Sequence, residues 1–150
     1  AKSFHVGEID QNKKKLLDVT SESLAKAIDK AIPGNFVGDI GFTVQKHAED
    51  NGFSVVRELV GHGIGSQLHE EPQIPNFGRK GTGDLLVPGM TLAIEPMVNL
   101  GKPDTKILSD NWTAVTRDKS LSAQFEHTVA VTNSGVEVLT LSPQDKFFPF

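Results

Sequence analysis

Apolar positions along the first third of the chain follow the spacing of a helix. In residues 12–31, apolar or small side chains recur three and four positions apart, which places them on one face of an α-helix. Pro33 and Gly34 then end the predicted helix. The residues of this predicted buried face are Leu16, Thr20, Leu24, Ala27, Ile28 and Ala31.

A second helix is predicted at residues 39–50, where Ile40, Val44 and Ala48 share one stripe. Asn51 and Gly52 form its expected C-terminal cap, because glycine adopts the left-handed conformation that commonly ends a helix.

The remainder of the chain favours strands. Strands are expected at residues 53–59, 90–95, 112–116, 121–132 and 136–141, with a turn at 133–135 before the last of them. Residues 61–89 show no periodicity and are rich in glycine and proline, so a long ordered or functional loop is expected there. Helices followed by antiparallel-looking strands predict an α+β fold, with helices packed on one face of a curved antiparallel sheet.

The predicted strand at residues 121–132 has one apolar and one polar face. Phe125, His127, Val129 and Val131 share the first face, and Gln124, Glu126 and Thr128 share the second. We therefore expect Glu126 to line a pocket and His127 to pack in the core.

Composition narrows the class of protein. The net charge of −4 argues against a nucleic-acid surface, which normally needs a basic face. No cysteine is present, which rules out disulfides and thiolate metal sites. No apolar run approaches the roughly 18 residues that span a membrane, and no secretion signal is seen, so a cytoplasmic location is expected. Residues 1–7 alternate like a strand from the first position, so the chain is expected to begin within a strand.

Four residues are candidates for metal or acid–base chemistry. His62 lies between two glycines, which give its imidazole access to a crowded centre, although a turn that happens to contain histidine is an alternative. His69 follows seven positions later, a spacing that does not fit the helical HExxH zinc motif. Glu95 is held extended by the next residue, a proline, and could equally form a strand-end salt bridge. Together with Glu126, these residues suit Mn, Fe, Co or Zn. Taken alone, His69 could be a capping or surface histidine, and the two glutamates after it could be solvated.

Five ordered strings resemble those of type I methionine aminopeptidase over essentially the whole chain. They are Gly61-His62-Gly63-Ile64-Gly65, Leu68-His69-Glu70-Glu71-Pro72, Pro88-Gly89-Met90-Thr91, Ile94-Glu95-Pro96-Met97 and Ser120-Leu121-Ser122-Ala123-Gln124-Phe125-Glu126-His127-Thr128.

This resemblance implies the pita-bread fold, in which two pseudo-symmetric α+β halves close over two divalent metal ions (Co, Mn, Fe or Zn). It implies removal of the initiator methionine from nascent polypeptides. Residues 1–150 would form the C-terminal part of that catalytic domain. They would comprise slightly more than one of its two halves and lack the N-terminal part. By the same resemblance, His62 and Glu95 are ligands of one metal, Glu126 bridges both, and His69 is catalytic, contacting the scissile peptide.

Leu68 and Trp112 match substrate-binding positions of the family. Two aspartate ligands of the family belong to a segment just before the residues matched by 1–7, so activity is expected only with an N-terminal segment of the same enzyme, as a separate or a missing piece. A prolidase or Xaa-Pro aminopeptidase is one alternative within the fold. A non-catalytic binding protein, or an isolated inactive half, is another.

Overall fold

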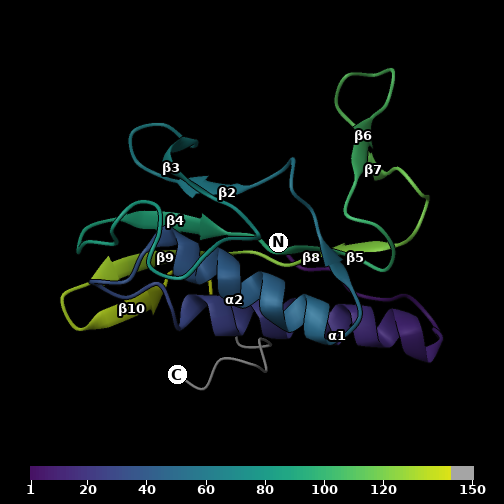
Figure 1. The fold of residues 1–150 in the computed structure, drawn as a ribbon, viewed down its shortest axis with the longest axis horizontal. Coiled ribbons are helices and arrows are strands. Elements are labelled where there is room, and N and C mark those ends of the chain that lie inside the picture. Colours follow the sequence, from purple (N-terminus) through teal and green to yellow (C-terminus); the bar gives the residue numbers. More distant parts are fainter. Residues whose placement is uncertain (143–150) are drawn as a thin grey trace.

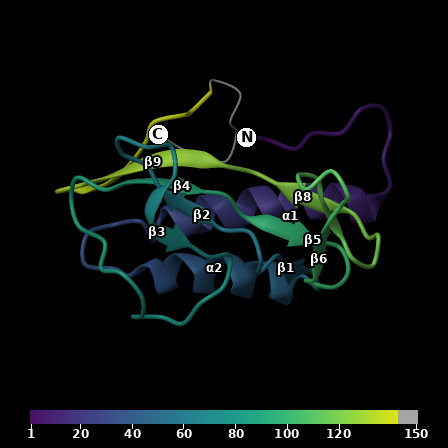
Figure 2. The same ribbon diagram turned by 90° about the horizontal axis from the view of Figure 1, so that it is seen from above.

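The computed structural model describes residues 1–142, in which two helices pack along one face of a set of antiparallel strands. Helix α1 comprises Gln11–Ile28 and helix α2 comprises Val37–Asp50. The helices lie side by side beneath the strands in Figure 1, and Figure 2 shows the strands crossing over them. The predicted α+β arrangement, with helices on one sheet face, is confirmed.

Helix α1 has the predicted buried stripe, but it is shorter than predicted. Asp10 caps its first turn by accepting the Lys13 backbone N–H at 3.0 Å. After Ile28 the backbone tightens into three-residue hydrogen bonds, from Lys30 to Ala27 and from Ala31 to Ile28. The apolar spacing therefore continues past the last helical residue. All six predicted face residues are buried: Leu16, Thr20, Leu24, Ala27, Ile28 and Ala31.

Helix α2 begins two residues before the predicted start because Asp39 caps it from within. The Asp39 carboxylate accepts the Phe36 N–H at 2.8 Å and the N–H of Gly81 at 3.0 Å. The predicted C-terminal cap is confirmed, since Asn51 is the C-cap residue and Gly52 has φ +85°. The predicted stripe of Ile40, Val44 and Ala48 is fully buried.

The strands are short and all their pairings are antiparallel. Their bounds are β1 Ser54–Val55, β2 Gly61–Gly63, β3 Glu70–Ile74, β4 Thr91–Ile94, β5 Met97–Asn99, β6 Thr105–Ile107, β7 Ala114–Thr116, β8 Ser122–Gln124, β9 His127–Thr132 and β10 Gly135–Val138. One sheet has five strands in the order β10-β9-β4-β2-β3, a second has three in the order β1-β5-β8, and β6 and β7 form a hairpin.

The two larger sheets are joined by a seam that the chain crosses twice. The chain passes from β4 to β5 through Glu95 and Pro96, and from β8 to β9 through Phe125 and Glu126. The Phe125 N–H bonds the Pro96 carbonyl across the seam at 3.3 Å. The single strand predicted at residues 121–132 is therefore two strands in different sheets. Its alternation is nevertheless confirmed, since Phe125, His127, Val129 and Val131 are buried.

The expected loop at residues 61–89 proved partly wrong, because it contains β2 and β3. Strands β5 and β6 were not predicted, and the strand expected at 53–59 shrinks to Ser54–Val55. Short strands of this kind are held by their neighbours rather than by a period-two pattern of their own. At the N-terminus the expected strand reduces to one bridge between Lys2 and Phe125.

The core lies between the helices and the inner faces of the two larger sheets. Its largest fully buried side chains include Leu24, Ile28, Ile40, Leu92, Ile94, Val98 and Val129. Within residues 1–142, neither helix has the length and apolar character needed to traverse a bilayer.

Candidate metal-binding site

His62 lies in the middle of β2, and the glycines beside it allow three strands to come close together. A Cβ atom on Gly61 would collide with the Ala93 carbonyl of β4, and one on Gly63 would collide with the Glu71 carbonyl of β3. The glycines thus serve backbone approach on both sides of the histidine.

The His62 ring is oriented by its own strand. Its Nδ1 lies 2.9 Å from the Gly63 carbonyl oxygen, which can only accept, so Nδ1 carries a proton. The other ring nitrogen, Nε2, faces the Glu95 Oε1 atom at 3.6 Å. Both side chains are only 15% exposed. Fixing one ring nitrogen on a carbonyl and presenting the other is the usual arrangement of a metal-binding histidine.

Glu95 follows the last residue of β4 and lies in the seam. Gln124 donates its amide Nε2 to Glu95 Oε2 at 3.0 Å, which orients the carboxylate toward His62. Burial raises the pKa of Glu95 above its usual value, and the negative charge of Glu126 raises it further, against the opposing effects of His62 and the α-ammonium group. The ionised carboxylate is therefore stabilised by any cation placed beside it.

Glu126 lies in the other half of the seam, immediately before β9. The β4–β9 register pairs Ile94 with His127, so Glu95 and Glu126 follow as the next neighbours across the two strands. The Glu126 N–H donates to the Ala1 carbonyl at 2.8 Å, which holds the backbone of the seam at this residue.

His69 and Leu68 lie in the loop between β2 and β3. The rings of His69 and His62 have centroids 4.2 Å apart and are tilted by 59°. Leu68 is 68% exposed. The loop therefore brings the proposed catalytic histidine onto His62 and leaves the leucine open to solvent.

Trp112 lies in the turn of the β6–β7 hairpin and is 87% exposed. This hairpin stands apart from β2 and β3 in both ribbon views. The assignment of Trp112 to a substrate site stays a prediction, as do those of Leu68 and His69.

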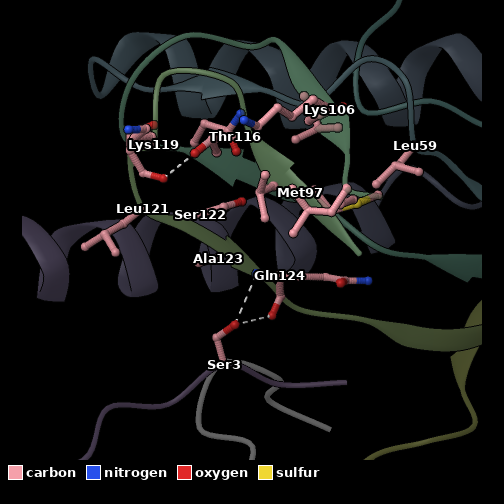
Figure 3. Close-up of a pocket in the computed structure, with 17 residues that line it drawn as sticks. Ser3, Leu59, Met97, Lys106, Thr116, Lys119, Leu121, Ser122, Ala123 and Gln124 are labelled. Carbon is pink, nitrogen blue, oxygen red and sulfur yellow. Dashed lines mark hydrogen bonds between the residues drawn. The ribbon is translucent and has the colours of Figure 1, made fainter. Parts of the chain in front are cut away.

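A cavity of about 730 Å³ lies between this hairpin and the three-stranded sheet. Figure 3 shows Met97, Thr116 and Ser122 on its wall, and Gln124 at one side, bonded to Ser3. Because Gln124 also bonds Glu95, the cavity borders the His62–Glu95 pair through a shared side chain.

The residues fit part of a metal site. Residues 1–142 contain no group of three or more His, Asp or Glu side chains arranged to hold a metal ion. His62 and Glu95 do lie together, with the charge of Glu126 acting on Glu95. One neutral imidazole nitrogen and two carboxylates, in a half-buried seam, are donors that divalent transition metals accept. A complete coordination shell needs further ligands.

Two polar residues at this site escaped the sequence-based interpretation. Gln124 was assigned to a polar face but not to Glu95. For Glu70 the sequence offered only that it could be solvated, whereas its carboxylate accepts the Gln67 N–H at 2.7 Å and the Ser66 hydroxyl at 3.0 Å. The only signal for Glu70 in the sequence is a serine four positions earlier, after a glycine. Glu71 is exposed, as expected for a solvated side chain.

Comparisons with known proteins place these features in a family. The family model described as "Metallopeptidase family M24" matches residues 1–133. Methionine aminopeptidase B of Synechocystis sp. is 51% identical over 142 residues, which cover 95% of this chain and 52% of that protein. The crystal structure of methionine aminopeptidase from Thermotoga maritima aligns with TM-score 0.92 and 50% identity, covering 94% of this chain and 57% of that one.

A likeness to the prolidase from Pyrococcus horikoshii is limited to the fold. The TM-score is 0.71 at 21% identity, covering 94% of this chain and 35% of that one. The chain spans about half the length of the curated relatives it matches. Methionine aminopeptidases and prolidases share the pita-bread fold, which is therefore the fold of this chain.

Proposed function

Because this chain belongs to metallopeptidase family M24, we propose that it supplies part of the metal site of an aminopeptidase that removes the initiator methionine from new polypeptides. The proposal applies to the natural polypeptide that contains these 150 residues. The chain is identical to methionine aminopeptidase B of Synechocystis sp. at 51% of the aligned positions, which supports this activity. Its likeness to the prolidase is one of fold alone and does not support prolidase activity.

One observation carries the proposal: His62 presents its Nε2 to the carboxylate of Glu95 at 3.6 Å. Two side chains that can ligate a metal face one another there in a half-buried place, and the negative charge of Glu126 acts on Glu95. Such a group of donors is unfavourable unless a cation lies among them. His62, Glu95 and Glu126 are the residues that would hold divalent metal ions.

Two such ions, when bound, supply an acidified water as the nucleophile and a Lewis acid for the peptide carbonyl. The further ligands would be two aspartates from a segment outside these residues. Within this chain, Gln124 keeps the Glu95 carboxylate turned toward His62, and Glu126 is accessible at the seam.

His69 would hold the negative charge that develops on the carbonyl oxygen of the scissile peptide. Its ring lies against that of His62, so a substrate bound beside His62 is within reach of both. Preorganised donors of this kind contribute about 3 kcal/mol to lowering a barrier. Leu68, adjacent in the loop and largely exposed, would contact the methionine side chain, with Trp112 as a second contact.

Metal binding tests the site directly. We expect the chain to bind Co²⁺ with visible absorption bands, and Glu95→Gln or His62→Ala to weaken that binding strongly. His5→Ala is the matched control, because His5 is an exposed histidine bonded to the nearby Gly7 carbonyl. Equal Co²⁺ affinity in all four proteins would exclude these residues as ligands.

Substrate preference tests the activity. We expect the natural polypeptide that contains this chain to cleave Met-Ala-Ser, to lose activity to a chelator, and to leave Xaa-Pro peptides intact. Preferential cleavage of Xaa-Pro peptides would favour a prolidase, and no cleavage of either would favour a non-catalytic binding protein. The 150-residue chain alone is expected to show little or no turnover.

A further inference from the structure

The loop that carries His69 is held by the side chain of Glu70 rather than by regular structure. Residues 64–69 connect β2 to β3 outside any helix or strand, and at their start the Ile64 N–H donates to the Thr91 carbonyl of β4 at 2.9 Å. Glu70 folds its carboxylate back into this loop, where Oε1 accepts the Gln67 N–H at 2.7 Å and the Ser66 hydroxyl at 3.0 Å. These bonds, the Gln67 N–H first, hold the pKa of Glu70 below its usual value, so the carboxylate is the charged acceptor at neutral pH.

The Glu70 carboxylate packs directly against the backbone of Gly65. A Cβ atom on Gly65 would overlap this carboxylate in its present position. The Gly65 N–H also donates to the Gln67 carbonyl at 3.1 Å, which closes the loop on itself. Glycine, an amide and a hydroxyl thus surround one charged side chain.

Glu70 connects this loop to the strand that bears His62. The backbone of Glu70 pairs with Gly63 in the β2–β3 register, beside a bulge between His62 and Gly63. One residue therefore holds the loop through its side chain and the neighbour of His62 through its backbone.

The His69 ring is restrained by its contact with His62 and by the backbone of this loop. Its side chain is exposed, and within residues 1–142 its ring nitrogens make no hydrogen bond. The ring contacts that of His62 at 4.2 Å between centroids. Where the ring lies is consequently set by the backbone on either side of it, and Glu70 is the next residue.

We propose that Glu70 is a positioning residue that keeps His69 against His62 by holding the loop at residues 64–69. The proposal rests on the proposed function, in which His69 contacts the peptide being cleaved. It assigns Glu70 no contact with substrate or metal. Its effect passes through His69 alone, which separates it from a residue that merely stabilises the fold.

Glu71 provides the matched control. It is the adjacent glutamate, it is exposed, and its carboxylate accepts the N–H of Gln73 within its own strand, at 3.1 Å. Glu70→Ala and Glu71→Ala remove the same charge one position apart, and only the first removes bonds to the loop.

The kinetic test uses the natural polypeptide with Met-Ala-Ser as substrate. Glu70→Ala is expected to lower kcat about tenfold with little change in KM, because a misplaced catalytic group loses rate rather than binding. Glu71→Ala should stay within about twofold of the parent. In a His69→Ala background, Glu70→Ala should have almost no further effect, because the two residues act as one unit. An undiminished effect of Glu70→Ala in that background would overturn the proposal.

A second measurement does not depend on peptidase activity. In protein with isotope-labelled histidines, the NMR signals of the His69 ring should shift or broaden in Glu70→Ala and stay in place in Glu71→Ala. Unchanged His69 signals in Glu70→Ala would refute the positioning role even if the peptidase were inactive. If Glu70→Ala does not fold, Glu70→Gln decides in its place, since it keeps the side-chain length and one acceptor oxygen, and a smaller loss of kcat is expected.

The two proposals fail in different ways. A parent protein that cleaves neither Met-Ala-Ser nor an Xaa-Pro peptide contradicts the proposed function, while the histidine signals still report on Glu70. A parent that cleaves Met-Ala-Ser, with Glu70→Ala and Glu71→Ala alike in kcat and in histidine signals, contradicts only the role of Glu70.

Discussion

Adding one methyl group at Gly63 should disturb the strand that carries His62. The Cβ of Gly63→Ala would overlap the backbone carbonyls of Glu71 and Glu70 on β3. These are main-chain atoms, so relief requires β2 and β3 to separate rather than a side chain to rotate. The pairing at risk joins Gly63 to Glu70 and His62 to Gln73.

The size of the effect follows from three contributions. Forcing extra volume into a packed site costs about 1–3 kcal/mol. Each interstrand hydrogen bond that is lost adds about 0.5–1.5 kcal/mol. Replacing glycine gives back about 0.4–1 kcal/mol by restricting the unfolded chain. We therefore expect a net destabilisation of about 1–3 kcal/mol, or a fall in Tm of roughly 3–10 °C for a chain of this length.

Thermal unfolding followed by far-UV circular dichroism measures this change. Trp112 fluorescence is the poorer probe, because its indole is already 87% exposed in the folded chain. Gln73→Ala is the matched control, since that exposed side chain lies on the same strand pair, opposite His62, and its loss should change stability by under about 0.5 kcal/mol. A Gly63→Ala protein with the Tm of Gln73→Ala would refute the close-approach argument.

Two further predictions concern carboxylates outside the site. Asp118 accepts the backbone N–H groups of Lys102 and Ser120, and these bonds lower its pKa to about 2. The pKa in the folded chain thus lies below the value of 3.8 in the unfolded chain. The stabilisation from Asp118 is therefore present above pH 3.8 and is lost as the pH falls toward 2. Acid unfolding of Asp118→Asn should accordingly depend less on pH in that window than the parent, and equal slopes would contradict the prediction. Asp39→Ala should destabilise by about 1–3 kcal/mol in urea, because it removes two backbone bonds that start α2 and hold the loop before β4. Asp50→Ala, which loses only an exposed ion pair to Lys46, should cost under about 0.5 kcal/mol, and equal losses would argue against the cap.

The sequence was most informative where burial is periodic. Both helices were predicted because three- and four-residue spacing reports one buried face directly. The end of α1 was predicted too late, because Ala31 remains buried after the backbone has left the helix. Strands β2 and β3 do alternate in burial, but glycines occupy the buried positions of β2 and a proline occupies one in β3. The sequence pattern therefore indicated a loop, although the glycines serve strand pairing.

The candidate site was predictable by residue type but not by arrangement. A period-two pattern placed Glu126 on a polar face, yet it cannot reveal that the strand changes sheets at that residue. The contacts of Glu95 with Gln124 and of Glu70 with its loop join residues that no spacing rule relates. Tertiary pairing, rather than local propensity, decides such contacts.

Strand β4 is central in the five-stranded sheet, whereas the His69 loop lies outside the strands. We therefore expect the seam glutamates and the loop to differ in how readily they open. Glu95 and Glu126 adjoin β4 and β9, whose amides are paired and covered by helices, so their hydrogen exchange should require opening of most of the protein. Residues 65–69 of the loop are exposed, and their side-chain hydrogen bonds come from the Glu70 carboxylate, so their amides should exchange through small local openings. Glu95 and Glu126 would then persist through motions that repeatedly release and restore His69. Exchange of substrate and product could proceed by such openings while the carboxylates of the seam stay in register.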